Sequence, residues 1–252
     1  MTDDQGKWVR RYRAAPEAAV RLVCLPHAGG AASYYRSMAT TLFPAVEVLA
    51  VQYPGRQDRA GEPGIGDFAE LAERTFAAVR PALDRPVALF GHSMGALLAF
   101  EVTKRLEADG FAPLVLFASG ERPPGRPGSE PSHTATDEEL IAEIAALDGT
   151  DERLLDSEEA RLLFLPALRA DYQALATYRC DGTQVACPVV SLTGDNDSRV
   201  SIDDAAAWAN HTAGQFDLHV FPGGHFYLTG QWGAVGEVLT KHLEAHVSAR
   251  TG

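Results

Sequence analysis

The sequence has few cysteines, no excess of basic residues and no long apolar run. Its three cysteines, Cys24, Cys180 and Cys187, have no metal-type spacing, and their odd number argues against a disulfide framework. Lysine and arginine total 22 against 34 aspartates and glutamates, and this net charge of −12 argues against binding to nucleic acid or to an anionic membrane surface. No stretch approaches the roughly 18 apolar residues of a membrane span, and the N-terminus lacks the apolar core of a signal peptide. We therefore expect a cytoplasmic protein.

Short apolar segments alternate with longer segments of helical periodicity along the whole chain. Because the short segments are continuously apolar, they are typical of strands covered on both faces, as in a parallel sheet. The chain is predicted to form one α/β domain over residues 1–252, with a mostly parallel, doubly wound sheet. The predicted strands are 21–25, 46–51, 87–90, 114–117, 189–192 and 218–221, and the predicted helices are 33–43, 67–83, 94–109, 202–213 and 231–247.

The interval between the predicted strands 114–117 and 189–192 is far longer than a crossover between parallel strands requires. It opens with a segment rich in proline and glycine and continues with two helical patterns. Thr136 and Glu139 have the spacing of a capping box, and Pro166 is expected to kink or split the second helix. The interval predicts an inserted helical lid over about 122–180.

The pentapeptide Gly91-His92-Ser93-Met94-Gly95 stands between a predicted strand and a predicted helix. This is the context of a nucleophile elbow, in which a tight turn exposes a serine and the flanking glycines leave room for a strained backbone. The following helix N-terminus favours a developing negative charge. Ser93 is therefore the candidate nucleophile.

A serine nucleophile needs a base, and the base needs an orienting acid. In α/β hydrolases the acid and then the histidine follow the serine in the chain. His225 lies in a glycine-rich loop after the last predicted strand, and it alone of the eight histidines has both this order and this loop. Asp195 and Asp197 both follow the preceding strand; we prefer Asp197 as the acid, although local spacing leaves both open.

An oxyanion hole needs two backbone N–H groups close to the serine. The residue after the nucleophile, Met94, supplies the first candidate donor, and Ala28 in the glycine-rich loop after the first predicted strand supplies the second. Neither of the phosphate-binding glycine patterns, G-x-x-x-x-G-K-[ST] and G-x-G-x-x-G, is present, so no nucleotide is expected there. We predict no cofactor and no metal.

Five motifs follow one another along the chain: Leu25-Pro26-His27-Ala28-Gly29-Gly30, Tyr53-Pro54-Gly55-Arg56, Gly91-His92-Ser93-Met94-Gly95, Gly194-Asp195-Asn196-Asp197 and Gly223-Gly224-His225-Phe226. Taken together, they resemble the motifs of the type II thioesterases, the stand-alone editing enzymes of polyketide and nonribosomal peptide synthases. In that family the second aspartate of Gly-Asp-x-Asp is the triad acid, which favours Asp197, and many members have Phe-Pro where this chain has Leu25-Pro26. Arg56 is expected to fix local structure rather than to contact the substrate.

The resemblance implies an α/β-hydrolase fold and hydrolysis of aberrant or stalled acyl groups from the phosphopantetheine arm of acyl or peptidyl carrier domains. We take a monomer as the default. Carrier domains are usually acidic, so the net charge of −12 should repel them. Any attraction must then come from local basic residues such as Arg122, Arg126 or Arg199.

Two alternatives remain at this point. The first is another hydrolase of the same fold, either a thioesterase for fatty acyl carrier protein or acyl-CoA, or a carboxylesterase. The second is a catalytically inactive carrier-binding module, against which the intact triad residues argue. The triad alone does not distinguish the hydrolases, because their chemistry is shared.

Overall fold

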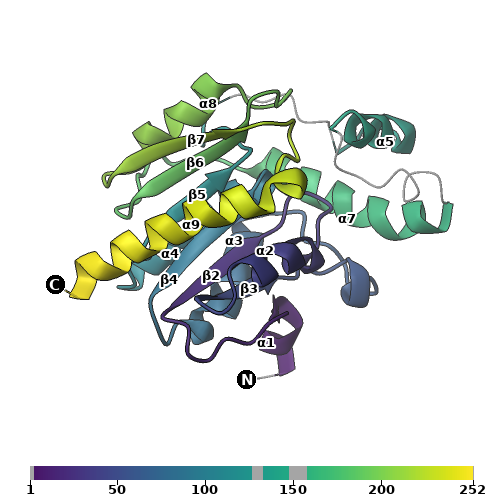
Figure 1. Cartoon of the computed structure of the whole chain (residues 1–252). Helices are drawn as coiled ribbons and strands as arrows, with labels where there is room; N and C mark the ends of the chain where they lie inside the picture. Colours follow the sequence, from purple (N-terminus) through teal and green to yellow (C-terminus); the bar gives the residue numbers. More distant parts are fainter. Residues whose placement is uncertain (1–2, 127–132, 148–157, 252) are drawn as a thin grey trace.

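A mostly parallel sheet organises the molecule (Figure 1). The structure, a computed structural model, describes residues 3–126, 133–147 and 158–251. In these residues seven strands form one sheet of order β1-β3-β2-β4-β5-β6-β7, in which only the β1–β3 pair is antiparallel. The expected doubly wound α/β architecture is confirmed. The strands are β1 Val9–Arg10, β2 Val20–Leu25, β3 Val46–Val51, β4 Val87–His92, β5 Leu116–Ser119, β6 Val189–Gly194 and β7 Phe216–Phe221.

Helices cover both faces of the sheet. Side chains of α3 and α4 pack on one face, and those of α2 and α9 pack on the other. None of the helices in the described ranges has the length and apolarity needed to cross a membrane. The α-helices are α1 Asp3–Trp8, α2 Arg36–Thr41, α3 Phe68–Val79, α4 Met94–Ala108, α5 Asp137–Ala145, α7 Glu158–Thr177, α8 Ile202–Ala206 and α9 Leu228–Thr251. Short 3-10 helices are η1 Ala32–Tyr35, η2 Gln57–Arg59, η3 Arg80–Ala82 and η4 Ala207–His211.

Several boundaries differ from the prediction. The strand predicted at 114–117 begins two residues later, and the helix predicted at 202–213 changes to 3-10 geometry at Ala207. The two-residue strand β1 was not predicted, because so short a segment carries no periodicity. These differences lie at the ends of elements, where sequence signals are weakest.

Between β5 and β6 the described residues contain the helices α5 and α7, which Figure 1 shows beyond one end of the sheet. The predicted capping box at the start of α5 is present, with Thr136 and Glu139 each bonded to the other's backbone N–H. The prediction for Pro166 was wrong in one respect: α7 continues through it as one helix. Pro166 lies on an exposed part of α7, where the carbonyl left without an N–H partner can bind water.

The two helices share a small apolar cluster that Ala28 of the loop after β2 also contacts. The predicted lid segment thus packs on the loop that we expect to bind the oxyanion. The cluster is formed by Leu140, Ile144, Leu165, Leu168 and Tyr172.

Candidate active site

Ser93 occupies a strained turn between β4 and α4. Its φ and ψ are 54° and −130°, in a region that non-glycine residues rarely adopt, and its backbone N–H donates to the Ser119 carbonyl at 2.8 Å. A Cβ atom on Gly91 would lie 2.0 Å from the Gly95 carbonyl oxygen, and one on Gly95 would lie 2.1 Å from the Leu25 carbonyl oxygen. Both flanking glycines are therefore sterically required, as the elbow pattern predicted.

His225 and Asp197 are hydrogen-bonded to each other. The Nδ1 atom of His225 lies 3.0 Å from Asp197 Oδ2 and 3.2 Å from Oδ1. The Asp197 side chain is fully buried, and its Oδ1 also accepts from the backbone N–H groups of Arg199 and Val200. A carboxylate held in this way fixes the imidazole with its proton on Nδ1 and leaves Nε2 as a base.

Asp195 has a different set of partners. Its Oδ1 accepts from the backbone N–H of Gly223 at 2.9 Å and from the Asn196 side chain. Asp195 therefore connects the end of β6 to the loop after β7, and its hydrogen bonds in the described part of the chain go to Gly223 and Asn196. Of the two aspartates that the sequence left open, Asp197 is the one hydrogen-bonded to the histidine.

The loop that carries His225 lies against the elbow. The ring of His92, the residue before Ser93, has its centroid 5.2 Å from that of His225. Ser93 is 7% exposed and His225 is 3% exposed. The serine turn and the histidine–aspartate pair thus share one enclosed region at the carboxyl ends of the strands.

His92 is fully buried behind this region. Its Nδ1 atom is bonded to the Ser119 hydroxyl at 2.9 Å, and that hydroxyl is bonded to the Tyr227 hydroxyl at 2.7 Å. Burial, together with the nearby rings of His225 and His27, lowers the pKa of His92 well below its usual value. His92 is therefore a neutral residue near neutral pH, and it packs against the back of the elbow.

The two candidate oxyanion donors come from neighbouring segments. Met94 is the first residue of α4, and Ala28 lies in the loop after β2. The close approach of Gly95 to the carbonyl of Leu25 brings the start of α4 against the end of β2. In the same loop, the N–H of Gly29 donates to Asp171 of α7 at 2.7 Å.

A buried ion pair joins this loop to α7. Arg56, in the turn after β3, donates from Nη1 and Nη2 to the two carboxylate oxygens of Asp171 at 2.8 and 2.9 Å. Arg56 also donates to the Gly30 carbonyl at 3.0 Å. Both side chains are at most 5% exposed. The expectation that Arg56 fixes local structure agrees with these contacts, but its partner Asp171 was not foreseen.

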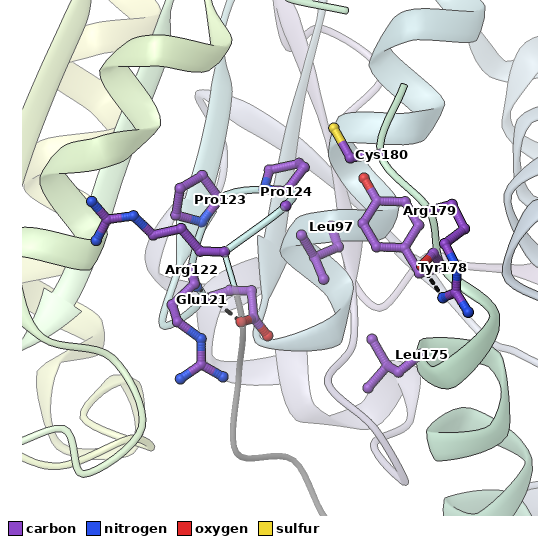
Figure 2. A pocket seen from close by; sticks show the side chains of 11 residues that line it. Leu97, Glu121, Arg122, Pro123, Pro124, Leu175, Tyr178, Arg179 and Cys180 are labelled. Atoms are coloured by element: carbon purple, nitrogen blue, oxygen red, sulfur yellow. Dashed lines mark hydrogen bonds between the residues drawn. The ribbon is translucent and has the colours of Figure 1, made fainter. Parts of the chain in front are cut away.

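A cavity of about 360 Å³ lies beside α4 (Figure 2). Figure 2 shows Leu97 of α4 between the loop after β5 on one side and Leu175, Tyr178 and Arg179 on the other. Leu97 stands one helical turn after Ser93, so the cavity borders the elbow helix near its N-terminus. The lining is Leu97, Glu121, Arg122, Pro123, Pro124, Gly125, Arg126, Leu175, Tyr178, Arg179 and Cys180.

A serine on a strained strand-to-helix turn, with a histidine–carboxylate pair at the ends of two later strands, defines the molecule as an α/β hydrolase. Comparison with known proteins narrows this class. Residues 20–244 match the thioesterase domain family.

Named relatives agree with this match. The chain is 46% identical over 251 residues to the thioesterase PikA5 of Streptomyces venezuelae, covering 96% of this chain and 89% of that protein. It is 32% identical to the gramicidin S biosynthesis protein GrsT of Aneurinibacillus migulanus, covering 94% of each. The solved structure of the type II thioesterase BorB, from the borrelidin biosynthetic cluster, superposes with a TM-score of 0.87 at 47% identity and covers 94% of this chain and 97% of its own. The chain belongs to the thioesterase family, and the resemblance to type II thioesterases is confirmed.

Proposed function

We propose that Ser93, His225 and Asp197 form the catalytic triad of this thioesterase. The observation that carries the proposal is the pairing of a buried His225–Asp197 hydrogen bond with a serine held at positive φ in the adjoining elbow. Each part matches a role that acyl transfer requires: a nucleophile, a general base and a group that orients the base.

In the proposed reaction, His225 Nε2 takes the proton of the Ser93 hydroxyl while Oγ attacks the thioester carbonyl. The backbone N–H groups of Met94 and Ala28 stabilise the negative charge on the carbonyl oxygen. The thiol leaves with the proton from His225, and an acyl-serine remains. His225 then takes a proton from water as the water oxygen attacks the acyl-serine carbonyl, and it returns this proton to Ser93 Oγ as the ester bond breaks and the free acid leaves. Asp197 stabilises the imidazolium in both halves.

We propose acyl groups on the phosphopantetheine arm of carrier domains as the substrates, released when they are aberrant or stalled. This proposal is supported by relatives named for the biosynthesis of gramicidin S and borrelidin. The three free cysteines, two of them buried, suit the reducing cytoplasm where we place the reaction.

We assign the acyl chain to the cavity beside α4. Its apolar lining residues Leu97, Leu175 and Tyr178 can contact an alkyl chain, and Pro123 and Pro124 bound it. Because the space is about 360 Å³, turnover should fall beyond a limiting chain length. A panel of carrier domains that differ only in acyl length measures this limit, and equal turnover at all lengths would contradict the assignment.

The triad is tested with Ser93→Ala in two assays. Wild type should hydrolyse acyl-carrier thioesters and should be labelled by a fluorophosphonate probe, whereas the variant should lose labelling and at least about 10³-fold in turnover. Equal labelling of the two proteins would refute Ser93 as the nucleophile.

The substrate class is tested separately, with an acyl carrier, an acyl-CoA and a simple ester of equal acyl length. A preference for the carrier thioester is expected. A clear preference for the ester or the acyl-CoA would overturn the editing role and leave the triad untouched.

A further inference from the structure

A cluster of one carboxylate and two imidazoles lies on β7 and α9, separate from the proposed triad. Asp217 and His219 are two residues apart on β7 and so project from the same face of this edge strand. Phe221, on the same face, belongs to the core cluster that includes Leu239 of α9, and His242 stands one turn after Leu239 on that helix. Figure 1 shows α9 lying along this face of the sheet.

The three side chains converge on one point. His219 Nε2 lies 3.1 Å from His242 Nε2, and Asp217 Oδ2 lies 3.3 Å from the first of these atoms and 3.5 Å from the second. A tetrahedral zinc ion with bonds of about 2.0–2.1 Å separates its ligand atoms by about 3.3–3.4 Å. The three atoms therefore form a triangle of the same size as one face of a tetrahedral zinc site.

The surroundings orient these atoms. The backbone N–H of Leu218 donates to Asp217 Oδ1 at 2.9 Å, so the other carboxylate oxygen faces the histidines. The rings of His219 and His242 are nearly perpendicular, and His242 packs edge-on against Phe117. The histidine side chains are 27% and 17% exposed, which leaves the site open to ions from solvent.

We propose that Asp217 Oδ2, His219 Nε2 and His242 Nε2 bind a divalent transition-metal ion, with zinc as the ion of reference and water in the fourth position. Two imidazoles select zinc, nickel, cobalt or copper over calcium and magnesium, which prefer oxygen ligands. Each of the three atoms directs a lone pair toward the same point. A proton there makes a hydrogen bond with one of them, whereas a metal ion can bind all three. The bound ion would join the edge strand β7 to the C-terminal helix α9 and stabilise their packing.

The test uses tag-free, chelator-stripped protein titrated with zinc chloride. Calorimetry should show one equivalent bound, and saturating zinc should raise the melting temperature by about 5 °C. Cobalt bound in place of zinc should give the visible absorption of a tetrahedral ion without a thiolate charge-transfer band.

The variants Asp217→Asn, His219→Ala and His242→Ala should each weaken zinc binding at least about tenfold. His133→Ala and Cys180→Ser are matched controls that remove a histidine and a partly exposed thiol elsewhere, and both should bind zinc as wild type does. Asp217→Asn keeps the proposal testable if a histidine variant is poorly folded, because its side chain is 55% exposed. Absence of stoichiometric zinc binding in wild type, or unchanged binding in Asp217→Asn and His242→Ala, would overturn the proposal.

Discussion

Asp195 and Asp197 have the same side chain, so their roles can be distinguished only by their hydrogen-bond partners. Asp197 bonds to His225, whereas Asp195 bonds to the backbone of Gly223. Asp197→Asn should lower turnover by about 10³-fold or more, because an amide can hold the imidazole in the wrong tautomer. Asp195→Asn should lower turnover less than about tenfold and reduce the free energy of unfolding by about 1 kcal/mol.

Steady-state kinetics with one acyl-carrier substrate, together with urea unfolding, measure both effects. If Asp195→Asn were the more damaging change to turnover, with the protein still folded, the acid of the triad would have to be reassigned.

His92 makes stability depend on pH. Burial, with the neighbouring His225 and His27, lowers the pKa of His92 in the folded state, whereas an unfolded histidine titrates near 6.5. The unfolded chain therefore binds the proton first, and the stability contributed by neutral His92 is complete above pH 6.5 and declines as the pH falls below it. The decline from this group is at most about 1.4 kcal/mol per pH unit.

Replacing His92 with asparagine should flatten the dependence of the unfolding free energy on pH between 6.5 and 5, while an amide can still bond to Ser119. Urea unfolding at several pH values measures the slope. His133→Ala, which removes a histidine in the loop before α5, is measured beside it as the control. The same slope in His92→Asn as in wild type would show that another group causes the decline.

At the scale of elements, the Arg56–Asp171 ion pair connects the turn after β3 to α7. Removing one partner leaves a buried charge uncompensated, so Arg56→Met and Asp171→Leu should each destabilise the protein by about 3–5 kcal/mol. The double variant should cost much less than the sum of the two, because both charges are then absent.

A double-mutant cycle in urea measures this coupling. The exposed pair Glu70–Arg74 on α3 is the matched control, with side chains 48% and 58% exposed, and its removal should change the stability by less than about 1 kcal/mol. Additive losses from Arg56→Met and Asp171→Leu would mean that the pair does not hold α7 on the loop.

The sequence predicted best those features whose signals are local. The elbow could be identified because its glycines, serine, strand and helix are contiguous, and the capping box of α5 because its two residues are three apart. Asp171 could not be identified, because its partner Arg56 is 115 residues away and nothing distinguishes it from the other charges of α7. His219 and His242 could not be paired from the sequence for the same reason, since 23 residues separate them.

At the scale of the whole molecule, the basic residues expected to attract a carrier domain are occupied within the chain. Arg126 pairs with Asp204, and Arg199 pairs with Glu143 of α5 at 2.7 Å. Arg122 donates to the carbonyl of Arg199 at 2.6 Å. Carboxylates within the chain thus offset the charges of Arg126 and Arg199, and the net charge of −12 is left to dominate the long-range field.

Added salt should therefore help rather than hinder an acidic carrier. As ionic strength rises from about 0.05 to 0.5 M the Debye length shortens to a few ångströms, so repulsion between like-charged partners is screened. We expect kcat/KM for an acyl-carrier substrate to stay constant or to rise by about twofold to tenfold over this range. The same acyl group on an uncharged N-acetylcysteamine thioester is the control, and its kcat/KM should not change, because it carries no charge to be repelled.

A steep fall of kcat/KM confined to the carrier substrate would show that a local basic contact outweighs the charge of the whole molecule. The first residue to replace would then be Arg179, because its side chain donates to backbone carbonyls of its own segment.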